Sequence, residues 1–455
     1  MKIVIIGDGK IGNTISCLLL KEGHDIVVVD KNLNTLETTQ GLQDIMCVEG
    51  NGALYDVQME AGVDTADLLI ACTASDEMNM LACLLAKKIG AKATIARVRD
   101  PQYYQQLRYI KEDLGLGMAM NPEYATAQEI ARVLTFPAAT RIDLFAKGRI
   151  ELVEFKLAEN SVLDGLSLAE VYRRYKIRVL VCAVQRDKKV YIPDGSFVLR
   201  NGDKIHISAS HKDIAEFFKT IHGLRDKVRS VIIVGGGRIA YYLAVRLIKQ
   251  NTNVKIIDND YARCVELSER LPKATVIYGD GTDQSLLLEE GLLNVDGFAA
   301  LTGIDEENII MSIYAKNNNV SKVIPKVNRS SYMEMIEQLG LECMVSPKIV
   351  AANNVVSYVR AMQNSMGSNV ETLYRLVDGQ VEAMEFLVRE DAPYLGIPLC
   401  KLSIRKGILI AGIVRNRQQI VPDGETVIEK GDSVILATTN LRLRDLGEIF
   451  TDGKR

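Results

Sequence analysis

Hydrophobic residues in the first hundred positions gather in short runs, and the segments between these runs repeat their apolar positions with a helical period. The runs lie at 3–6, 26–29, 45–48, 68–72 and 94–98. They are apolar at almost every position, which is typical of strands buried on both faces of a sheet. The segments between them, such as 11–22 and 78–89, predict helices. Buried strands that alternate with helices indicate parallel βαβ units.

The same order of runs returns in the second half of the chain. The second set lies at 231–234, 254–257, 274–277, 298–301 and 323–327. Gly235 follows Gly7 by 228 positions, and after one inserted residue Lys326 follows Arg97 by 229 positions. Because chance does not hold one spacing over so long a stretch, we infer a tandem duplication.

A second type of segment follows each set of runs. Stretches of strand length, apolar or alternating, lie at 179–184, 204–208, 408–414 and 433–437. Turns with Pro-Asp-Gly and Gly-Asp sequences separate them, so each group predicts a small β-rich module. Before each module a proline opens a predicted helix, at 124–134 and at 349–362. Proline is favoured in a first helical turn because no N–H partner is needed there.

The predicted fold class is therefore α/β, with two Rossmann-like, doubly wound parallel sheets that are each followed by a small, β-rich α+β module. Two nucleotide-binding domains are predicted, each with a crossover helix that leads into its module. The predicted boundaries are 1–120 with a helix at 121–138, a module at 139–224, then 228–345 with a helix at 346–366, and a module at 367–455.

The first run ends in a glycine-rich loop, Gly7-Asp8-Gly9-Lys10-Ile11-Gly12. In the dinucleotide-binding pattern, Gly7 allows the tight turn, Gly9 lets the backbone approach a pyrophosphate, and Gly12 lets helix and strand pack closely. The N-terminus of the following helix offers free N–H groups and a positive dipole end to phosphates. The loop therefore predicts a nucleotide cradle, and a glycine-rich turn without a ligand is the alternative.

An acidic residue stands where this pattern needs one. Asp30 ends the second run, 18 residues after Gly12, where its carboxylate is placed to accept hydrogen bonds from ribose hydroxyls. The same carboxylate repels a 2′-phosphate, so NAD(H) or an adenine nucleotide is favoured over NADP(H).

The second repeat carries a related loop, Gly235-Gly236-Gly237-Arg238-Ile239. Ala240 takes the place of the third glycine, a small residue that the pattern tolerates, and Asp258 follows 18 positions later. Arg238 stands at the position of Lys10, and either side chain contacts a phosphate or is solvated. We predict a second cradle, whose nucleotide need not be the same as the first.

Polar residues that follow the third and fourth runs are further candidates. Asn51 and Asp280 follow the third run of each repeat and either line the adenine side of the cleft or form Asx turns. Thr73 and Thr302 follow the fourth run, where capping of the next helix is the favoured role and ligand contact the alternative.

Composition narrows the function classes. The chain has 455 residues, of which 47% are hydrophobic and 25% charged, as in a folded globular protein. Lys and Arg total 55 against 58 Asp and Glu, a net charge of -3, so no overall positive field draws the molecule to nucleic acid. The eight Cys form no CxxC pair, and the longest apolar runs fall far short of the ~18 residues of a membrane span. No signal peptide is recognised before the first run, and we expect a cytosolic protein.

Catalytic motifs are missing from the sequence. Only four His occur, and none lies where a nicotinamide would meet a substrate in the nucleotide-binding domains. No Ser-His-Asp order, HExxH or Walker-type loop is present, and no spacing suits a metal site. A dehydrogenase normally joins its dinucleotide fold to a substrate domain with an acid or base. We therefore expect binding without turnover, with no catalytic residue and no metal ligand.

These motifs together resemble the RCK/KTN family of potassium-transport regulators. The resemblance rests on GDGKIG with Asp30, on CTASDEMN from Cys72, on ARVRDP from Ala96, and on the Pro-Asp-Gly and Gly-Asp module. The tandem layout is similar to that of the regulatory subunits of Trk potassium uptake systems, and the similarity covers essentially the whole chain. Ala240 and Lys326 depart from the pattern of the first repeat, which leaves the second ligand open between NAD(H) and ATP or ADP.

The resemblance implies a regulatory subunit that assembles as a homo-oligomeric ring on the inner face of the cell membrane. Its implied partner is a membrane potassium-translocating subunit of the TrkH/TrkG type, gated by nucleotide-dependent conformational change. The residues implied to line the two sites are Gly7, Asp8, Gly9, Lys10, Ile11, Asp30, Thr73, Ala74, Arg97, Gly235, Gly236, Gly237, Arg238, Ile239, Asp258 and Lys326. Two other interpretations stay open: an NAD-dependent oxidoreductase, and a soluble nucleotide sensor unconnected with transport.

Overall fold

A computed structural model describes most of the chain. The described residues are 1–42, 45–136, 138–159, 161–176, 178–187, 189–222, 228–365, 370–376, 380–389, 392–439, 443 and 445–451. The predicted domain boundaries at 224, 366, 367 and 455 lie outside them. The chain forms two compact units: Met1–Ala131 with Arg229–Val356, and Arg132–Val228 with Ser357–Arg455.

The first repeat forms a parallel sheet with the strand order β3-β2-β1-β4-β5-β6. Its strands are β1 (Lys2–Ile6), β2 (Asp25–Asp30), β3 (Met46–Glu49), β4 (Leu68–Ala71), β5 (Ala93–Arg97) and β6 (Met118–Met120). The five predicted strands are confirmed. The sequence analysis missed β6, because three residues are too few to show a period. On either side of β1 the chain order of the strands reverses, and in such sheets ligands bind at this switch point.

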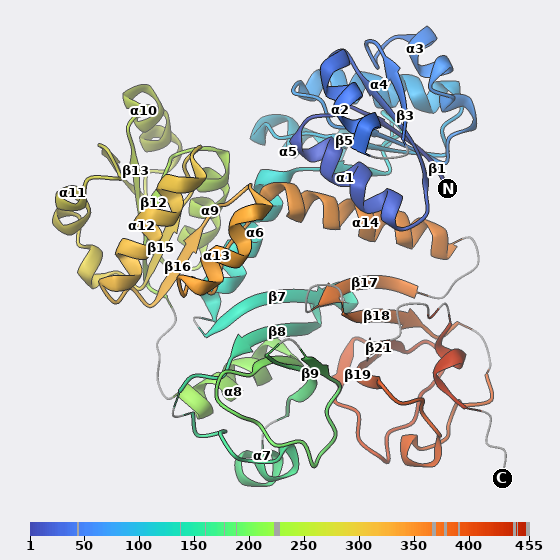
Figure 1. Cartoon of the computed structure of the whole chain (residues 1–455), viewed down its shortest axis with the longest axis vertical. Helices are drawn as coiled ribbons and strands as arrows, with labels where there is room; N and C mark the ends of the chain where they lie inside the picture. The colour runs from blue at the N-terminus through green and yellow to red at the C-terminus, as the bar shows by residue number, and fades with distance from the viewer. Residues whose placement is uncertain are drawn as a thin grey trace. The chain divides into compact units, whose positions relative to one another are not determined.

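Helices join these strands, as the apolar period predicts (Figure 1). They are α1 (Lys10–Lys21), α2 (Leu33–Leu42), α3 (Tyr55–Glu60), α4 (Asp76–Ile89) and α5 (Pro101–Ile110), with a short 3-10 turn at Val63–Thr65. The proline-started helix α6 (Pro122–Thr135) follows β6. Ser75 is the N-cap residue of α4, and its side chain accepts from the amide of Met78; the helix carries two lysines in its last turn. Both features suit the helix dipole.

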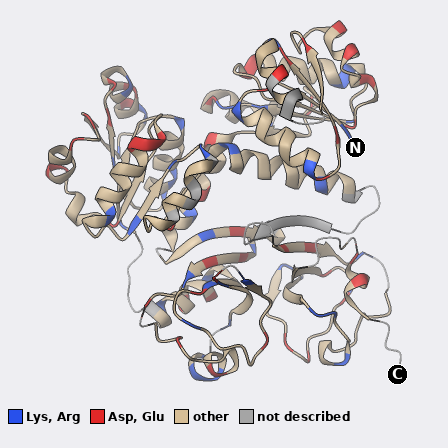
Figure 2. Cartoon of the chain, viewed as in Figure 1, with Lys and Arg blue, Asp and Glu red and all other residues tan. Residues whose placement is uncertain are grey.

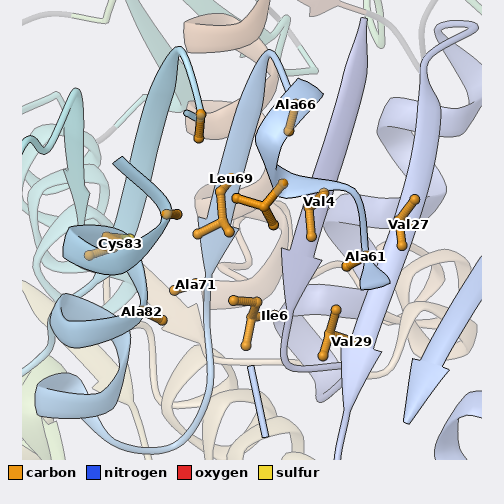
Figure 3. Close-up of a cluster of buried hydrophobic side chains, with 14 of the residues drawn as sticks. Val4, Ile6, Val27, Val29, Ala61, Ala66, Leu69, Ala71, Ala82 and Cys83 are labelled. Atoms are coloured by element: carbon orange, nitrogen blue, oxygen red, sulfur yellow. The ribbon is translucent and has the colours of Figure 1, made fainter. Parts of the chain in front are cut away.

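The core of this sheet is built from residues that alternate along the strands. Val4 and Ile6 of β1 lie beside Val27 and Val29 of β2, all of them buried. Figure 3 shows these side chains together with Leu69 and Ala71 of β4 and with Ala82 and Cys83, which α4 contributes. Cys83 is fully buried, and burial raises the pKa of its thiol to about 12. It packs in this core as a small hydrophobe.

The second repeat has the same topology, with the strand order β14-β13-β12-β15-β16. Its strands are β12 (Ser230–Val234), β13 (Asn253–Asp258), β14 (Thr275–Tyr278), β15 (Gly297–Ala300) and β16 (Lys322–Pro325). Its helices are α9 (Arg238–Lys249), α10 (Tyr261–Arg270), α11 (Gln284–Glu289), α12 (Asp305–Asn317), α13 (Met333–Gln338) and α14 (Pro347–Ser365), with 3-10 turns at Leu292–Asn294 and Ser330–Tyr332. A single parallel bridge between Lys326 and Val345 stands where the first repeat has β6.

The other unit holds the two modules, each an antiparallel sheet of five strands. The first has the order β10-β9-β11-β8-β7, from β7 (Ala139–Phe145), β8 (Ile150–Lys156), β9 (Leu180–Arg186), β10 (Lys189–Tyr191) and β11 (Lys204–Ala209). It also contains α7 (Leu168–Tyr175), α8 (His211–His222) and a 3-10 turn at Ala146–Gly148. The second has the order β17-β18-β21-β19-β20, from β17 (Val370–Leu376), β18 (Val381–Leu387), β19 (Ile408–Arg415), β20 (Gln418–Ile420) and β21 (Ser433–Thr438), with 3-10 turns at Leu399–Lys401 and Leu446–Ile449.

The Gly-Asp turns of the modules carry a buried ion pair that the sequence analysis did not foresee. Asp203 is 1% exposed and accepts two hydrogen bonds of 2.8 Å from the guanidinium of Arg186. Asp432 and Arg415 repeat the arrangement at 2.9 Å in the second module. A bidentate pair of this kind ties the turn to the neighbouring strand, so the aspartate has a structural role beyond the turn.

The two modules pack on each other through a shared apolar cluster. Phe145 and Leu152 of the first module contribute to it, as do Ala383 and Ile435 of the second. The predicted fold class, two Rossmann-like sheets each followed by a β-rich module, is confirmed. In the part of the chain that the structure describes, no helix has the length and apolar character needed to cross a membrane.

Candidate functional site

The first glycine loop needs glycine at two positions for steric reasons. Gly7 has a φ of +101°, and a Cβ there would lie 2.9 Å from the backbone nitrogen of Thr73. A Cβ on Gly12 would lie 1.9 Å from the carbonyl oxygen of Gly7. Larger residues at these positions would push the loop away from β4, so both glycines are required by the packing of strand, loop and helix.

Gly9 is different, because a Cβ there would meet no atom within 4 Å. It is the N-cap residue of α1 and provides no side-chain cap, so the first amides of the helix point toward open space. The second loop repeats both features. Gly235 has a φ of +95°, and Gly237 is the open, uncapped N-terminal residue of α9. Each loop thus presents unpaired backbone donors on the side where a phosphate would approach.

The two acidic residues at the strand ends are tied to these loops. Asp30 Oδ2 accepts a hydrogen bond of 2.6 Å from the amide of Asp8, and its Oδ1 accepts one of 2.9 Å from the amide of Asn32. Asp258 accepts in the same way from the amides of Gly236 and Asp260. Each carboxylate oxygen retains a lone pair, which leaves acceptor capacity for a ribose hydroxyl.

Thr73 and Thr302 do not cap the following helices, so the favoured prediction for them was wrong. Ser75 caps α4, and the N-cap residue of α12 is Ile304, which makes no side-chain cap. Thr73 instead binds Asn79: its amide and hydroxyl donate to Asn79 Oδ1 at 2.8 and 2.7 Å. Thr302 donates to Asn308 Oδ1 in the same way, with its amide and its hydroxyl at 2.9 Å.

Asn79 is fully buried and joins two strand ends, a role that the sequence analysis missed. Its Nδ2 donates to the carbonyl oxygens of Thr73, after β4, and of Arg97, at the end of β5. Asn308 makes the same contacts with Thr302 and Lys326 in the second repeat. The available signal was the spacing, since Asn79 and Asn308 lie 229 positions apart like the other matched residues.

The remaining predicted residues take local structural roles. Asn51 Oδ1 accepts from the amide of Ala53, and Asp280 Oδ1 accepts from the amide and the hydroxyl of Thr282. These are Asx turns, one of the two alternatives for this pair. The hydrogen bonds from Thr282 hold the pKa of Asp280 below its usual value. The backbone carbonyl of Ala74 accepts from Arg99.

The two glycine loops open on one common cavity of about 450 Å³. Eight predicted residues line it: Gly9, Lys10, Ile11, Arg97, Gly237, Arg238, Ile239 and Lys326. The other predicted residues do not line it; they are Gly7, Asp8, Gly12, Asp30, Asn51, Thr73, Ala74, Gly235, Gly236, Asp258, Asp280 and Thr302. Sequence reasoning missed six lining residues: Cys72, Glu123, Leu301, Asn328, Pro347 and Lys348.

Glu123 and Lys348 reach the cavity because each is the second residue of a proline-started helix, α6 or α14. The Asn-Pro-Glu and Ser-Pro-Lys sequences were visible as helix starts. Their position beside the glycine loops was not, because it depends on how the repeats pack together.

The charged groups of the cavity are mostly cations. Arg97 Nη2 lies 3.7 Å from Glu123 Oε1. Neither Nε of Arg97 nor Oε2 of Glu123 has a hydrogen-bond partner among the described residues. Burial lowers the pKa of Arg97 and of Lys326, since desolvation disfavours a charged group. Lys10 of the first loop lowers the pKa of Lys326 further, so the two repeats contribute to one electrostatic environment. Elsewhere, Figure 2 shows acidic and basic residues interspersed along the chain.

Comparison with known proteins connects this architecture to a family. The TrkA-N domain matches residues 3–121 and 231–347, and the TrkA-C domain matches 152–222 and 383–451. The chain belongs to the TrkA family. The family resemblance seen in the sequence is confirmed, and the TrkA-N matches coincide with the two glycine-loop repeats.

Curated TrkA relatives match over nearly their whole length. The Trk system potassium uptake protein TrkA homolog of Archaeoglobus fulgidus is 33% identical over 450 residues, which is 99% of this chain and 100% of that protein. The Trk system potassium uptake protein TrkA of Halomonas elongata is 31% identical over 460 residues, covering 100% of this chain and 99% of that protein.

Solved structures share this fold at lower identity. The GsuK channel bound to NAD has a TM-score of 0.64 at 20% identity, covering 96% of this chain and 77% of that chain. The crystal structure of the GsuK RCK domain has a TM-score of 0.63 at 20% identity, covering 96% and 92%. These likenesses concern the fold alone.

Proposed function

We propose that this chain is a nucleotide-binding regulatory subunit of a potassium uptake system. The observation that carries the proposal is the pair of uncapped helix N-termini, α1 and α9, that open on one cation-lined cavity. The named function of the full-length relatives supplies the transport context.

The proposed ligands are NAD(H), ATP and ADP. Backbone amides at Gly9 and Gly237 would receive the phosphates, while Asp30 and Asp258 would accept from ribose hydroxyls. GsuK has been solved bound to NAD and bound to ADP, which supports a nucleotide at this type of fold. The predicted site residues and the predicted boundaries of the four domains form part of this proposal.

The regulatory mechanism follows from the lack of catalytic motifs in the sequence and from the duplicated site. A ligand shifts a conformational equilibrium only through different affinities for the two conformations. Nucleotides at the two loops would favour one arrangement of the repeats, and a homo-oligomeric ring would pass this change to a membrane subunit of the TrkH/TrkG type. The protein would work at the inner face of the cell membrane, without turning over its nucleotide.

The test begins with calorimetric titration of the purified chain with NADH, NAD, ATP and ADP. Micromolar binding that is lost when Gly9→Ala and Gly237→Ala are combined is the expected result. Potassium flux is then measured in vesicles that hold the membrane subunit, with and without the chain and each nucleotide. Flux that does not respond to the chain, or sustained NADH oxidation by the chain, contradicts the proposal.

A further inference from the structure

Both glycine loops line a single cavity, an arrangement that two independent nucleotide sites do not require. Residues Gly9–Ile11 of the first loop and Gly237–Ile239 of the second line the same 450 Å³ space. The N-termini of α1 and α9 therefore deliver their amides and their positive dipole ends to one volume. Phosphates held at the two loops would share that volume.

The cavity lining carries more positive charge than a single diphosphate would neutralise. Five cationic side chains face one carboxylate, that of Glu123; the cations are Lys10, Arg97, Arg238, Lys326 and Lys348. Within the described residues, the structure gives the side chains of Lys10, Arg238 and Lys348 no hydrogen bond or ion pair. Because unpaired cations crowded in one cavity repel each other, a long anionic chain would stabilise this arrangement.

Asp30 and Asp258 indicate the direction in which a bound nucleotide would lie. Asp30 and Asp258 belong to the two glycine-loop sites but do not line the shared cavity. In the proposed mode of binding each would hold the ribose at its own loop, and the phosphates would lie in the shared space. A ligand that reached both loops would therefore have the order nucleoside, phosphates and nucleoside.

We propose that the two loops form one bipartite site, and that its ligand class is a dinucleoside polyphosphate whose phosphate chain spans the cavity. This inference rests on the proposed nucleotide-binding function. Two separate triphosphates would bring like charges face to face between the loops. One linked molecule removes the second association step, and linkage of two binding groups typically strengthens binding by about 10²–10⁴-fold.

The experiment uses diadenosine tetraphosphate and pentaphosphate as probes, with ATP and NADH as comparators, in calorimetry on the full chain. We expect one diadenosine polyphosphate per chain, bound at least about 100-fold more tightly than ATP, and two ATP per chain. Lys10→Glu or Arg238→Glu should bring the affinity for the linked probe down to that of ATP. Both side chains are exposed, so the variants are expected to fold.

Matched controls are Lys21→Glu and Lys249→Glu, at the opposite ends of α1 and α9. They make the same charge change far from the cavity, and the probe should bind them as it binds the unaltered chain. Two linked probes per chain with ATP-like affinity would overturn the bipartite site and leave the proposed function standing. No binding of any nucleotide would overturn both.

Discussion

The hydroxyl of Thr39 donates a hydrogen bond of 2.5 Å to the buried carboxylate of Asp8. In the second repeat the same two positions hold Gly236 and Leu267, 228 residues further on. A Cβ on Gly236 would lie 2.6 Å from Leu267 Cδ1, so the leucine fills the space that a side chain on the loop would need. The two repeats share the backbone of the loop, but the first has a buried polar pair where the second has apolar packing.

This difference predicts that the side chain at the Asp8 position makes the stability of the first repeat depend on pH, whereas Gly236 at the matching position of the second repeat has no group to titrate. Burial, the largest cause, raises the pKa of Asp8, and its Oδ1 has no partner among the described residues. The folded chain therefore holds the proton of this carboxyl group more tightly than the unfolded chain does. Such a group stabilises the fold below its unfolded-state pKa, and the contribution is lost as pH rises through the folded-state pKa.

Asp8→Asn should therefore gain stability over the unaltered chain as pH rises above about 4, with the gain levelling off beyond the folded-state pKa. Thermal unfolding of both proteins between pH 4 and 8 measures the difference. A difference in Tm that is constant over this range would show that Asp8 does not titrate in it.

Gly9→Ala and Gly12→Ala should separate binding from folding. A Cβ on Gly9 meets nothing, whereas one on Gly12 would lie 1.9 Å from Gly7 O. We expect Gly9→Ala to fold normally and to lose nucleotide affinity at the first loop, because the Cβ occupies the phosphate approach. Gly12→Ala should destabilise the chain by about 2–4 kcal/mol.

Urea unfolding and nucleotide titration of both variants supply the measurements. Ala240→Gly is the control from the second repeat. It should cost only about 1 kcal/mol, the difference in helix propensity between the two residues. Equal destabilisation by Gly9→Ala and Gly12→Ala would contradict the steric argument.

Asn79→Ala should destabilise the first repeat strongly. The substitution leaves the amide of Thr73 and the carbonyl oxygen of Arg97 without their buried partner. Leaving several buried groups unsatisfied costs about 1–3 kcal/mol each. Asn308→Ala should behave alike, since its contacts are the same. Asn79→Asp keeps the acceptor and loses the donors, so its unfolding midpoint in urea should be lowered as well. If any of these variants is as stable as the unaltered chain, the proposed role of the side chain is refuted.

Arg186→Met should cost about 3 kcal/mol, because it leaves Asp203 buried without its counter-charge. Arg200→Met is the matched control: the side chain of Arg200 is exposed, and only its backbone amide contacts Asp203. Chemical denaturation of both variants, and of Arg415→Met in the second module, tests the pairing. Similar losses for Arg186→Met and Arg200→Met would mean that the ion pair contributes little.

Much of the fold was predictable because its signals are local. A strand such as β1 is recognised from four neighbouring apolar residues, and the turn at Gly7 from a glycine that must adopt a positive φ. The duplication amplified these signals, since each weak motif occurs twice at one spacing. Thr73 was assigned wrongly for the opposite reason: its amide and hydroxyl donate to the buried Asn79, and neither the period nor the spacing shows a side-chain partner of this kind.

By itself, therefore, the sequence determined the tandem repeat, the two parallel sheets, the β-rich modules and the position of both glycine loops. Only the tertiary structure decided that the loops share one cavity, and that Glu123 and Lys348 enter it from separate helices. The physical reason is that apolar periodicity and backbone geometry act between neighbours in the chain. The meeting of two loops depends on side-chain packing between residues more than two hundred positions apart.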